Sequence, residues 1–222
     1  MSDRGVILEF DFTVLNGAEL LYETTKRFLS ELDGIAFDAR SEAQYLAGGN
    51  YQGGLAELFA AAKTKKTAQK AARDLAAAFN AALTAAVPAA AATPAFRNFV
   101  KVLSDKGVKV VIATRADVAA VRQSFVQVLS GDVVLYQETS TCYGAVKWDA
   151  WRRACAANRL RHLSTVAVTG SGHGVKSALI AGMGSMAVVN DRVAYQDFGG
   201  ADAVVDEISG TTAKKLLEIL RI

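Results

Sequence analysis

Five short apolar runs divide the chain, and most of their side chains are β-branched. They do not alternate with polar residues as a strand with one wet face would, so each run is typical of a strand buried on both faces of a parallel sheet. Segments long enough for helices separate the runs, which predicts right-handed crossovers between parallel strands. We therefore expect an α/β fold, with a Rossmann-like three-layer core built on a parallel sheet. The runs cover residues 5–10, 108–113, 133–136, 165–169 and 186–189.

A long stretch after the first run has no strand pattern. Its apolar residues between positions 20 and 32 recur at helical spacing, and the later part is rich in alanine. Pro88 and Pro94 bracket the return to the strand pattern, so we expect residues 89–92 to form a linker. The predicted organisation is a core of residues 1–15 and 93–222 with an inserted α-helical domain of residues 16–92.

The composition is that of a globular protein, with 51% hydrophobic and 21% charged residues and a formal net charge of +3. A chain of 222 residues can bury a sizeable core without a metal or disulfide. We find no apolar run of bilayer length, and the N-terminus lacks the order of a secretory signal. We expect a cytoplasmic protein without membrane association, and the mild charge disfavours nucleic acid as a partner.

The inserted domain carries a basic run on a predicted helix. Such runs most often form a solvated face, and this is the interpretation that we favour. The weaker alternative is that the run steers an anionic ligand or docks an acidic protein partner. The run consists of Lys63, Lys65, Lys66, Lys70 and Arg73.

The first predicted strand ends in two acids, Glu9 and Asp11. Their side chains point the same way at the carboxyl end of the strand, which is where ligands of open α/β sheets bind. Two neighbouring carboxylates can serve as a nucleophile or metal ligand and as a general acid/base. Taken alone, this segment favours a simpler interpretation, a strand end with two solvated acids.

The segment from Glu9 to Thr13 also resembles the first motif of the haloacid dehalogenase-like (HAD) hydrolase superfamily, in its phosphatase and phosphomutase subgroup. That motif is an apolar strand followed by Asp-x-Asp-Gly-Thr, and the helical insertion here resembles the cap domain that follows it. The resemblance implies that Asp11 is the general acid/base and that Thr13 contacts phosphate. It puts Glu9 at the nucleophile position, where the superfamily uses aspartate, and Phe12 in place of a glycine.

Three other segments resemble parts of the same site. Thr114 ends an apolar run and matches the second motif, which implies a hydrogen bond to the phosphoryl group. Lys147 lies just before a predicted helix and matches the third motif, which implies that it neutralises the phosphate and the attacking carboxylate. Asn50 and Tyr51 resemble the cap loop that lies over the substrate.

The fourth motif of the superfamily ends a strand with Gly-Asp, and its acid binds Mg²⁺. This chain has Gly170 and Ser171 there, and no acid elsewhere in that loop. Mg²⁺ prefers octahedral oxygen coordination that includes one or two carboxylates, so with Glu9 and Asp11 as the candidate ligands we expect weak binding at most. The added methylene of Glu9 shifts its carboxylate by roughly an ångström, which can cost ~10²-fold in rate.

Our leading hypothesis is a HAD-like pseudoenzyme. It keeps a phosphate-binding pocket, its Mg²⁺-dependent phosphoryl transfer is impaired, and it acts by binding a small phosphorylated or anionic ligand or by regulation. The first alternative is an active phosphohydrolase that uses Glu9 and Asp11 on a small phosphomonoester. The second alternative is a structural scaffold without a ligand.

The glycines after residue 169 have a competing interpretation. Gly170, Gly172 and Gly174 precede a predicted helix, and Asp191 follows the next strand, which superficially resembles a dinucleotide-binding fingerprint. That fingerprint needs further strands and helices downstream, and the chain ends soon after Asp191. A simpler possibility is an anion site formed by backbone N–H groups at the helix N-terminus.

Overall fold

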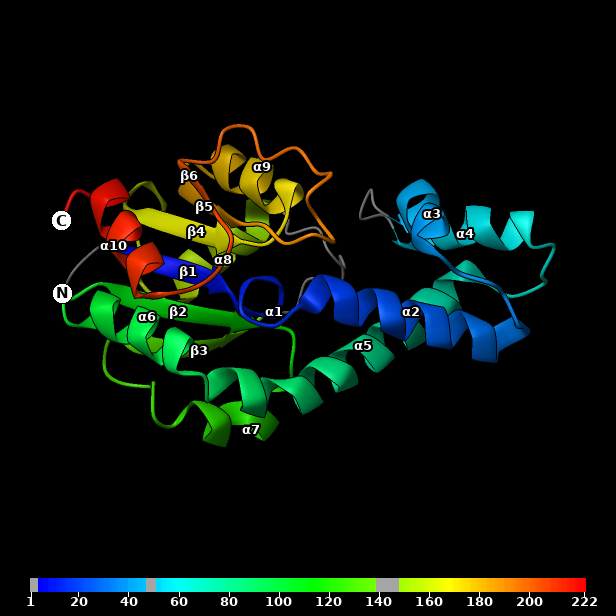
Figure 1. Cartoon of the computed structure of the whole chain (residues 1–222), viewed down its shortest axis with the longest axis horizontal. Helices are drawn as coiled ribbons and strands as arrows, with labels where there is room; N and C mark the ends of the chain where they lie inside the picture. The colour runs from blue at the N-terminus through cyan, green and yellow to red at the C-terminus, as the bar shows by residue number, and fades with distance from the viewer. Residues whose placement is uncertain (1–3, 47–50, 139–147) are drawn as a thin grey trace.

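The computed structural model describes residues 4–46, 51–138 and 148–222. These residues form a six-stranded parallel sheet with the strand order β3-β2-β1-β4-β5-β6 (Figure 1). The expected Rossmann-like α/β fold is therefore confirmed. The strands are β1 (Gly5–Glu9), β2 (Lys109–Thr114), β3 (Val133–Gln137), β4 (Thr165–Thr169), β5 (Gly184–Val188) and β6 (Ala203–Val205).

The central strand β1 pairs with β2 on one side and with β4 on the other. Glu9 is in register with Ala113, and Leu8 is in register with both Ile112 and Val168. Because all the strands run in parallel, their carboxyl ends meet at one edge of the sheet. Glu9, Thr114 and Thr169 end their strands there, and this edge carries the candidate site.

Helices cover both faces of the sheet, because alternate residues of each strand point to opposite faces. Val6 and Leu8 pack against α6 (Pro94–Ser104) and α10 (Gly210–Ile219). Ile7 lies on the other face, against α8 (Trp148–Ala157) and α9 (Gly172–Ile180). The remaining core elements are α1 (Phe10–Thr13), α7 (Val118–Val121), η2 (Arg122–Phe125) and η3 (His162–Ser164).

The inserted segment forms a helical unit with its own apolar centre, which we call the cap (Figure 1). Leu29, Leu55 and Phe59 are buried in this centre, away from the sheet. The cap therefore folds around a second core. Its elements are α2 (Gly17–Asp33), α3 (Ala39–Ser41), η1 (Glu42–Leu46), α4 (Tyr51–Ala61) and the first part of α5 (Ala68–Ala91).

Helix α5 joins the cap to the sheet core. Leu75 is buried in the cap centre, whereas Phe79, Leu83 and Val87 are buried in the core of the sheet domain. The helix continues through Pro88 to Ala91, so the expectation of a linker at residues 89–92 is wrong. The physical reason is tertiary packing, because Val87 and Ala91 are both buried and their burial outweighs the backbone hydrogen bond that Pro88 cannot make.

We expected no apolar run of bilayer length, but helix α5 has 24 residues and contains an 18-residue window with a mean hydropathy of 1.3, which is long and apolar enough to cross a membrane by length and composition alone. Alanine supplies much of this hydropathy. Its larger apolar side chains, including Leu75, Phe79 and Leu83, are buried inside the protein.

Candidate functional site

Two acids from the first motif lie at the carboxyl edge of the sheet. Glu9 is the last residue of β1, and the short helix α1 that follows carries Asp11 and Thr13. Asp11 is completely buried, and Glu9 is 4% exposed. The Thr13 hydroxyl donates a hydrogen bond to the Glu9 carbonyl at 2.7 Å, so in this structure it braces the turn.

Both carboxylate oxygens of Asp11 accept hydrogen bonds from the end of β2. Oδ1 accepts from the Thr114 hydroxyl at 2.6 Å, and Oδ2 accepts from the backbone N–H of Arg115 at 2.8 Å. The Thr114 Oγ1 also accepts from the N–H of Ala116 at 3.1 Å. The single hydroxyl proton of Thr114 is therefore directed at Asp11, and a phosphoryl group would have to displace that bond to use it.

The carboxylate of Glu9 is held from one side. Its Oε2 accepts from the Thr169 hydroxyl at 2.5 Å and from the N–H of Gly170 at 3.3 Å. Its Oε1 is buried and has no hydrogen-bond partner among the described residues. Gly170 allows this close approach, because a Cβ there would lie 2.2 Å from the Phe12 carbonyl oxygen.

Arg115 places a cation between these two acids. Its Nη1 lies 3.4 Å from Asp11 Oδ2 and 3.6 Å from Glu9 Oε1. The residue is 4% exposed, and its guanidinium lies over the ring of Phe12 at 5.3 Å from the centroid. Our sequence reasoning did not include Arg115. The only sign in the sequence that Arg115 could belong to the site was its position directly after Thr114. That position does not show where a long side chain points.

Burial controls the protonation of the three groups. It raises the pKa of the Glu9 carboxyl and of the Asp11 carboxyl, and the charge of Arg115 only partly opposes this effect. Burial lowers the pKa of the Arg115 guanidinium, but the neighbouring Glu9 and Asp11 outweigh it and raise that pKa above its usual value. Arg115 therefore stays charged, and its two partners are the groups that can change their protonation.

The residues present do not fit Mg²⁺ while Arg115 is in place. Mg²⁺ binds oxygen ligands at about 2.0–2.1 Å. An ion in contact with both Glu9 Oε1 and Asp11 Oδ2 would lie next to the positively charged Arg115 Nη1, which is 3.6 and 3.4 Å from these oxygens, and would be repelled by it. In addition, the described part of the chain has no group of three or more His, Cys, Asp or Glu side chains that could hold a metal ion.

Ser171 has a structural role in the fourth motif. It is buried at the N-cap of α9, and its Oγ accepts from the N–H of Gly174 at 3.0 Å. The N–H of Gly172 donates to Gln196 Oε1 at 2.8 Å. Two of the amides that could bind an anion at this helix N-terminus therefore already have partners within the protein.

Three further residues were predicted to belong to the site: Lys147, Asn50 and Tyr51. Lys147 and Asn50 lie outside the described residues. Tyr51 begins α4, and its side chain is not described. Their proposed roles remain predictions from the resemblance.

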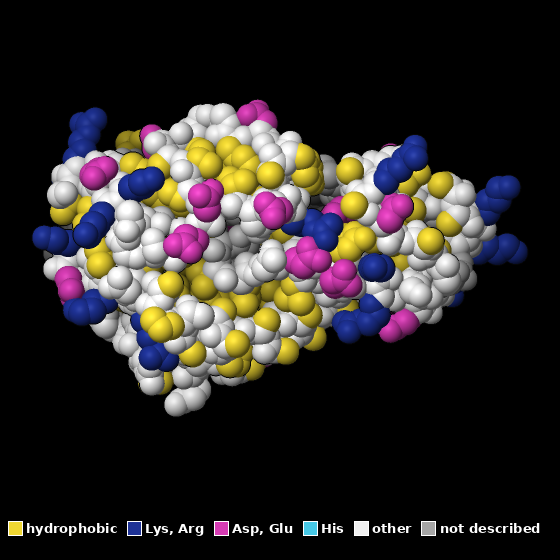
Figure 2. All heavy atoms as spheres, viewed as in Figure 1, with side chains coloured by type: hydrophobic (Ala, Val, Ile, Leu, Met, Phe, Trp, Pro, Cys, Tyr) yellow, Lys and Arg dark blue, Asp and Glu magenta, His cyan; other side chains and the backbone are white. Residues whose placement is uncertain are grey.

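The expectation that the basic run lies on one helix is wrong, because Lys63, Lys65 and Lys66 lie in the connection between α4 and α5, and only Lys70 and Arg73 lie in α5. Lys63, Lys65, Lys66, Lys70 and Arg73 are all exposed. Figure 2 shows Lys and Arg side chains at the end of the cap that is remote from the sheet. This position fits a solvated face, and the docking alternative remains an untested hypothesis.

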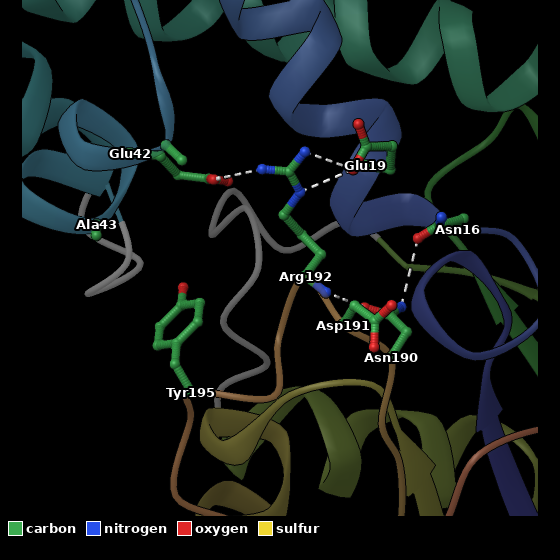
Figure 3. A pocket seen from close by; sticks show the side chains of 9 residues that line it. Asn16, Glu19, Glu42, Ala43, Asn190, Asp191, Arg192 and Tyr195 are labelled. Carbon is green, nitrogen blue, oxygen red and sulfur yellow. Dashed lines mark hydrogen bonds and ion pairs between the residues drawn. The ribbon is translucent and has the colours of Figure 1, made fainter.

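A cavity of about 540 Å³ opens between the core and the cap, a size typical of small-molecule sites (Figure 3). Sequence reasoning missed this cavity because its walls come from segments that are far apart in the chain. The polar side chains that line it are Asn16, Glu19, Glu42, Asn190, Asp191, Arg192 and Tyr195.

Arg192 connects the two sides of this cavity. It follows β5 in the core, and its Nη2 lies 2.6 Å from Glu19 Oε2 in α2. Its Nη1 lies 3.4 Å from Glu42 Oε2 in η1 (Figure 3). Its guanidinium lies over the Tyr22 ring, 4.0 Å from the centroid. One side chain therefore ties the core loop to two elements of the cap.

We expect Arg192→Ala to loosen the cap and to lower the free energy of unfolding by about 1 kcal/mol, because partly exposed ion pairs and cation–π contacts are each worth about that much or less. Urea unfolding measures the loss, and amide hydrogen exchange should be faster in α2 and η1. Arg73→Ala, at an exposed position of the same cap, is the matched control. Equal exchange rates in the two variants would contradict the role of Arg192.

No protein-family model matches the chain, and no curated protein matches its sequence. Solved structures do match. A HAD hydrolase, family IA, variant 3 from Entamoeba histolytica has a TM-score of 0.69 at 15% identity, over 99% of this chain and 100% of that chain. β-Phosphoglucomutase from Clostridium difficile has a TM-score of 0.67 at 13% identity, over 98% and 97% of the two chains. CbbY from Rhodobacter sphaeroides, solved in complex with phosphate, has a TM-score of 0.66 at 15% identity, over 92% and 94%. At these identities the similarity shows the fold.

Proposed function

We propose that this chain, which has the fold of the HAD phosphatases and phosphomutases, binds a small phosphorylated or anionic ligand and has impaired Mg²⁺-dependent phosphoryl transfer. It acts mainly through binding or regulation. The observation that carries this proposal is the position of Arg115, whose guanidinium lies between the two carboxylates of the first motif.

Three features support the loss of metal-dependent chemistry. Asp11 accepts hydrogen bonds on both oxygens, so its carboxylate is not free to move a proton without breaking them. Ser171 caps a helix at the position of the acid that the resemblance assigns to Mg²⁺. The Oε1 atom of Glu9 has no hydrogen-bond partner among the described residues, and the cation beside it is Arg115.

Ligand binding is supported by the cavity between core and cap and by the bound phosphate in the CbbY structure. The cavity is next to the core loop of Arg192, and Asn16 connects it in sequence to the first motif. The cavity lining does not include Glu9, Asp11 or Arg115, so a ligand in the cavity would contact the cap and the core loop of Arg192.

Phosphate release from a panel of phosphomonoesters in the presence of Mg²⁺ tests the proposal. We expect no turnover by the natural chain above that of Glu9→Gln, because Arg115 places a positive charge beside both candidate metal ligands. Glu218→Gln, at an exposed position of α10, is the matched control. Metal-dependent turnover that disappears only in Glu9→Gln would overturn the impairment. Thermal shift with inorganic phosphate and phosphomonoesters tests binding, and no shift with any of them would favour a scaffold without a ligand.

An active phosphohydrolase is the second candidate, because the buried Oε1 of Glu9 has no hydrogen-bond partner within the described residues and could attack or activate water. The double variant Glu9→Asp with Ser171→Asp separates the two proposals. Activity that appears only in the double variant supports impairment of the natural site, whereas activity that is already present in the natural chain supports the second candidate.

A further inference from the structure

The two acids at the carboxyl edge of the sheet share one cation from the protein itself. Two buried acids, Glu9 and Asp11, face one buried guanidinium, and the distances from Arg115 Nη1 to their nearest oxygens are 3.6 and 3.4 Å. A buried carboxylate needs a cation or hydrogen-bond donors close by, since burial penalises its charged form. Arg115 supplies both to Asp11.

Arg115 is also held firmly in this position. Its backbone N–H and its Nη1 both donate to Asp11 Oδ2, so the residue is tied to the same carboxylate at both ends. Its carbonyl accepts from the Gln137 side chain at 3.3 Å. The Phe12 ring covers the guanidinium, and Phe12 in turn packs against Phe79 of α5.

We propose that Arg115 is a resident cation that replaces a divalent metal in this site, and that its removal exposes a latent Mg²⁺ site formed by Glu9 and Asp11. This inference deepens the proposed function and rests on it for the location of the site. It explains why the two acids are kept close together although the fourth motif has lost its acid. It also gives Phe12, which stands in place of a glycine, a role: its ring holds the guanidinium of Arg115.

The positions of the Arg115 guanidinium and of the two carboxylates support the replacement of a metal ion by Arg115. The Nη1 atom lies at nearly equal distances from the two acids, so it offers one positive charge to both carboxylates, as a bridging ion would. The Oε1 of Glu9 is buried and has no hydrogen-bond partner in the described part of the chain, so it offers a ligand atom once the guanidinium is removed. Truncation at position 115 leaves the backbone N–H in place and frees space for a small ion with water molecules.

The test compares the natural chain with Arg115→Ala in thermal unfolding at increasing Mg²⁺ or Mn²⁺. We expect the melting temperature of the natural chain to be unchanged by either ion or by a chelator. We expect the melting temperature of Arg115→Ala to rise by about 5 °C or more when the free ion exceeds its Kd by about 100-fold.

Two matched variants show whether the effect belongs to this site. Arg122→Ala removes an exposed arginine from η2 and should gain no response to Mg²⁺. Arg115→Ala combined with Glu9→Gln should lose the response, because one of the two carboxylate ligands is gone. A folded Arg115→Ala variant whose melting temperature does not change with Mg²⁺ or Mn²⁺ would overturn the inference.

Titration calorimetry of the natural chain with Mg²⁺ gives a second test that does not depend on the folding of any Arg115 variant. Absence of binding supports the inference, and binding that is lost in Glu9→Gln would overturn it. The experiments also distinguish a failure of this inference from a failure of the proposed function. Metal-independent turnover of a phosphomonoester by the natural chain would overturn the proposal that it acts mainly by binding or regulation, and would leave Arg115 as the resident cation.

Discussion

Arg115→Met should lower the free energy of unfolding by about 3–5 kcal/mol near neutral pH, because it leaves two buried carboxylates without their cation. Methionine keeps most of the length of the side chain and its contact with Phe12, so the loss reports the charge more than the packing. Urea unfolding measures the change. Arg122→Met, at an exposed position, should change the stability by about 0.5 kcal/mol or less.

The loss in Arg115→Met should depend on pH with a definite sign. Burial raises the pKa values of Glu9 and Asp11 in the folded state above their usual values of 4.5 and 3.8. The stability from their protonation is therefore fully present below those usual values and is lost as the pH rises through the raised folded values. Without the charge of Arg115 both folded pKa values rise further, so the destabilisation should be larger at about pH 8 than at about pH 5. A loss that is independent of pH, or smaller than about 1 kcal/mol at about pH 8, would contradict the buried ion pairs.

Phe10→Ala should also cost about 3–5 kcal/mol, because it opens a cavity in the core of the sheet domain. Phe10 is completely buried in α1, and its ring lies 5.2 Å from the Phe96 ring and 5.1 Å from the Phe125 ring in edge-on contacts. These pairs connect α1 to α6 and η2, so the substitution removes packing from three elements at once. Edge-on aromatic contacts add about 0.5–1.5 kcal/mol beyond the buried area.

Denaturant unfolding of Phe10→Ala, Phe10→Leu and Val126→Ala tests this prediction. Phe10→Leu should have an intermediate effect because it fills part of the cavity, and Val126→Ala should have little effect because Val126 is 57% exposed. Phe10 lies between Glu9 and Asp11 in the sequence, so Phe10→Ala should also weaken the contacts of both acids with β2 and β4. Equal stabilities of Phe10→Ala and Val126→Ala would show that this aromatic cluster does not support the site.

The sequence predicted the main strands because fully buried parallel strands need short apolar runs, and that requirement is local. The run at residues 165–169 coincides with β4, and the other runs overlap β1, β2, β3 and β5. Strand β6 was missed because it has only three residues, of which Val204 is exposed, so it shows no buried run. The continuation of α5 through Pro88 was also missed, because packing of the helix face outweighed a local breaker.

The sequence by itself determined that Glu9 and Asp11 lie close to the end of a central strand, because they follow a buried apolar run directly. The expectation that both belong to the strand was wrong, because β1 ends at Glu9 and Asp11 lies in helix α1. Only the tertiary structure decided what faces them. Asp11 and Arg115 are 104 positions apart, and the direction of an arginine side chain depends on the space and charge that other elements provide. The same holds for the cavity of Arg192, whose walls come from the start of α2, from η1 and from the loop after β5. Local patterns fix the strands and their ends, whereas long-range packing fixes which charges meet there.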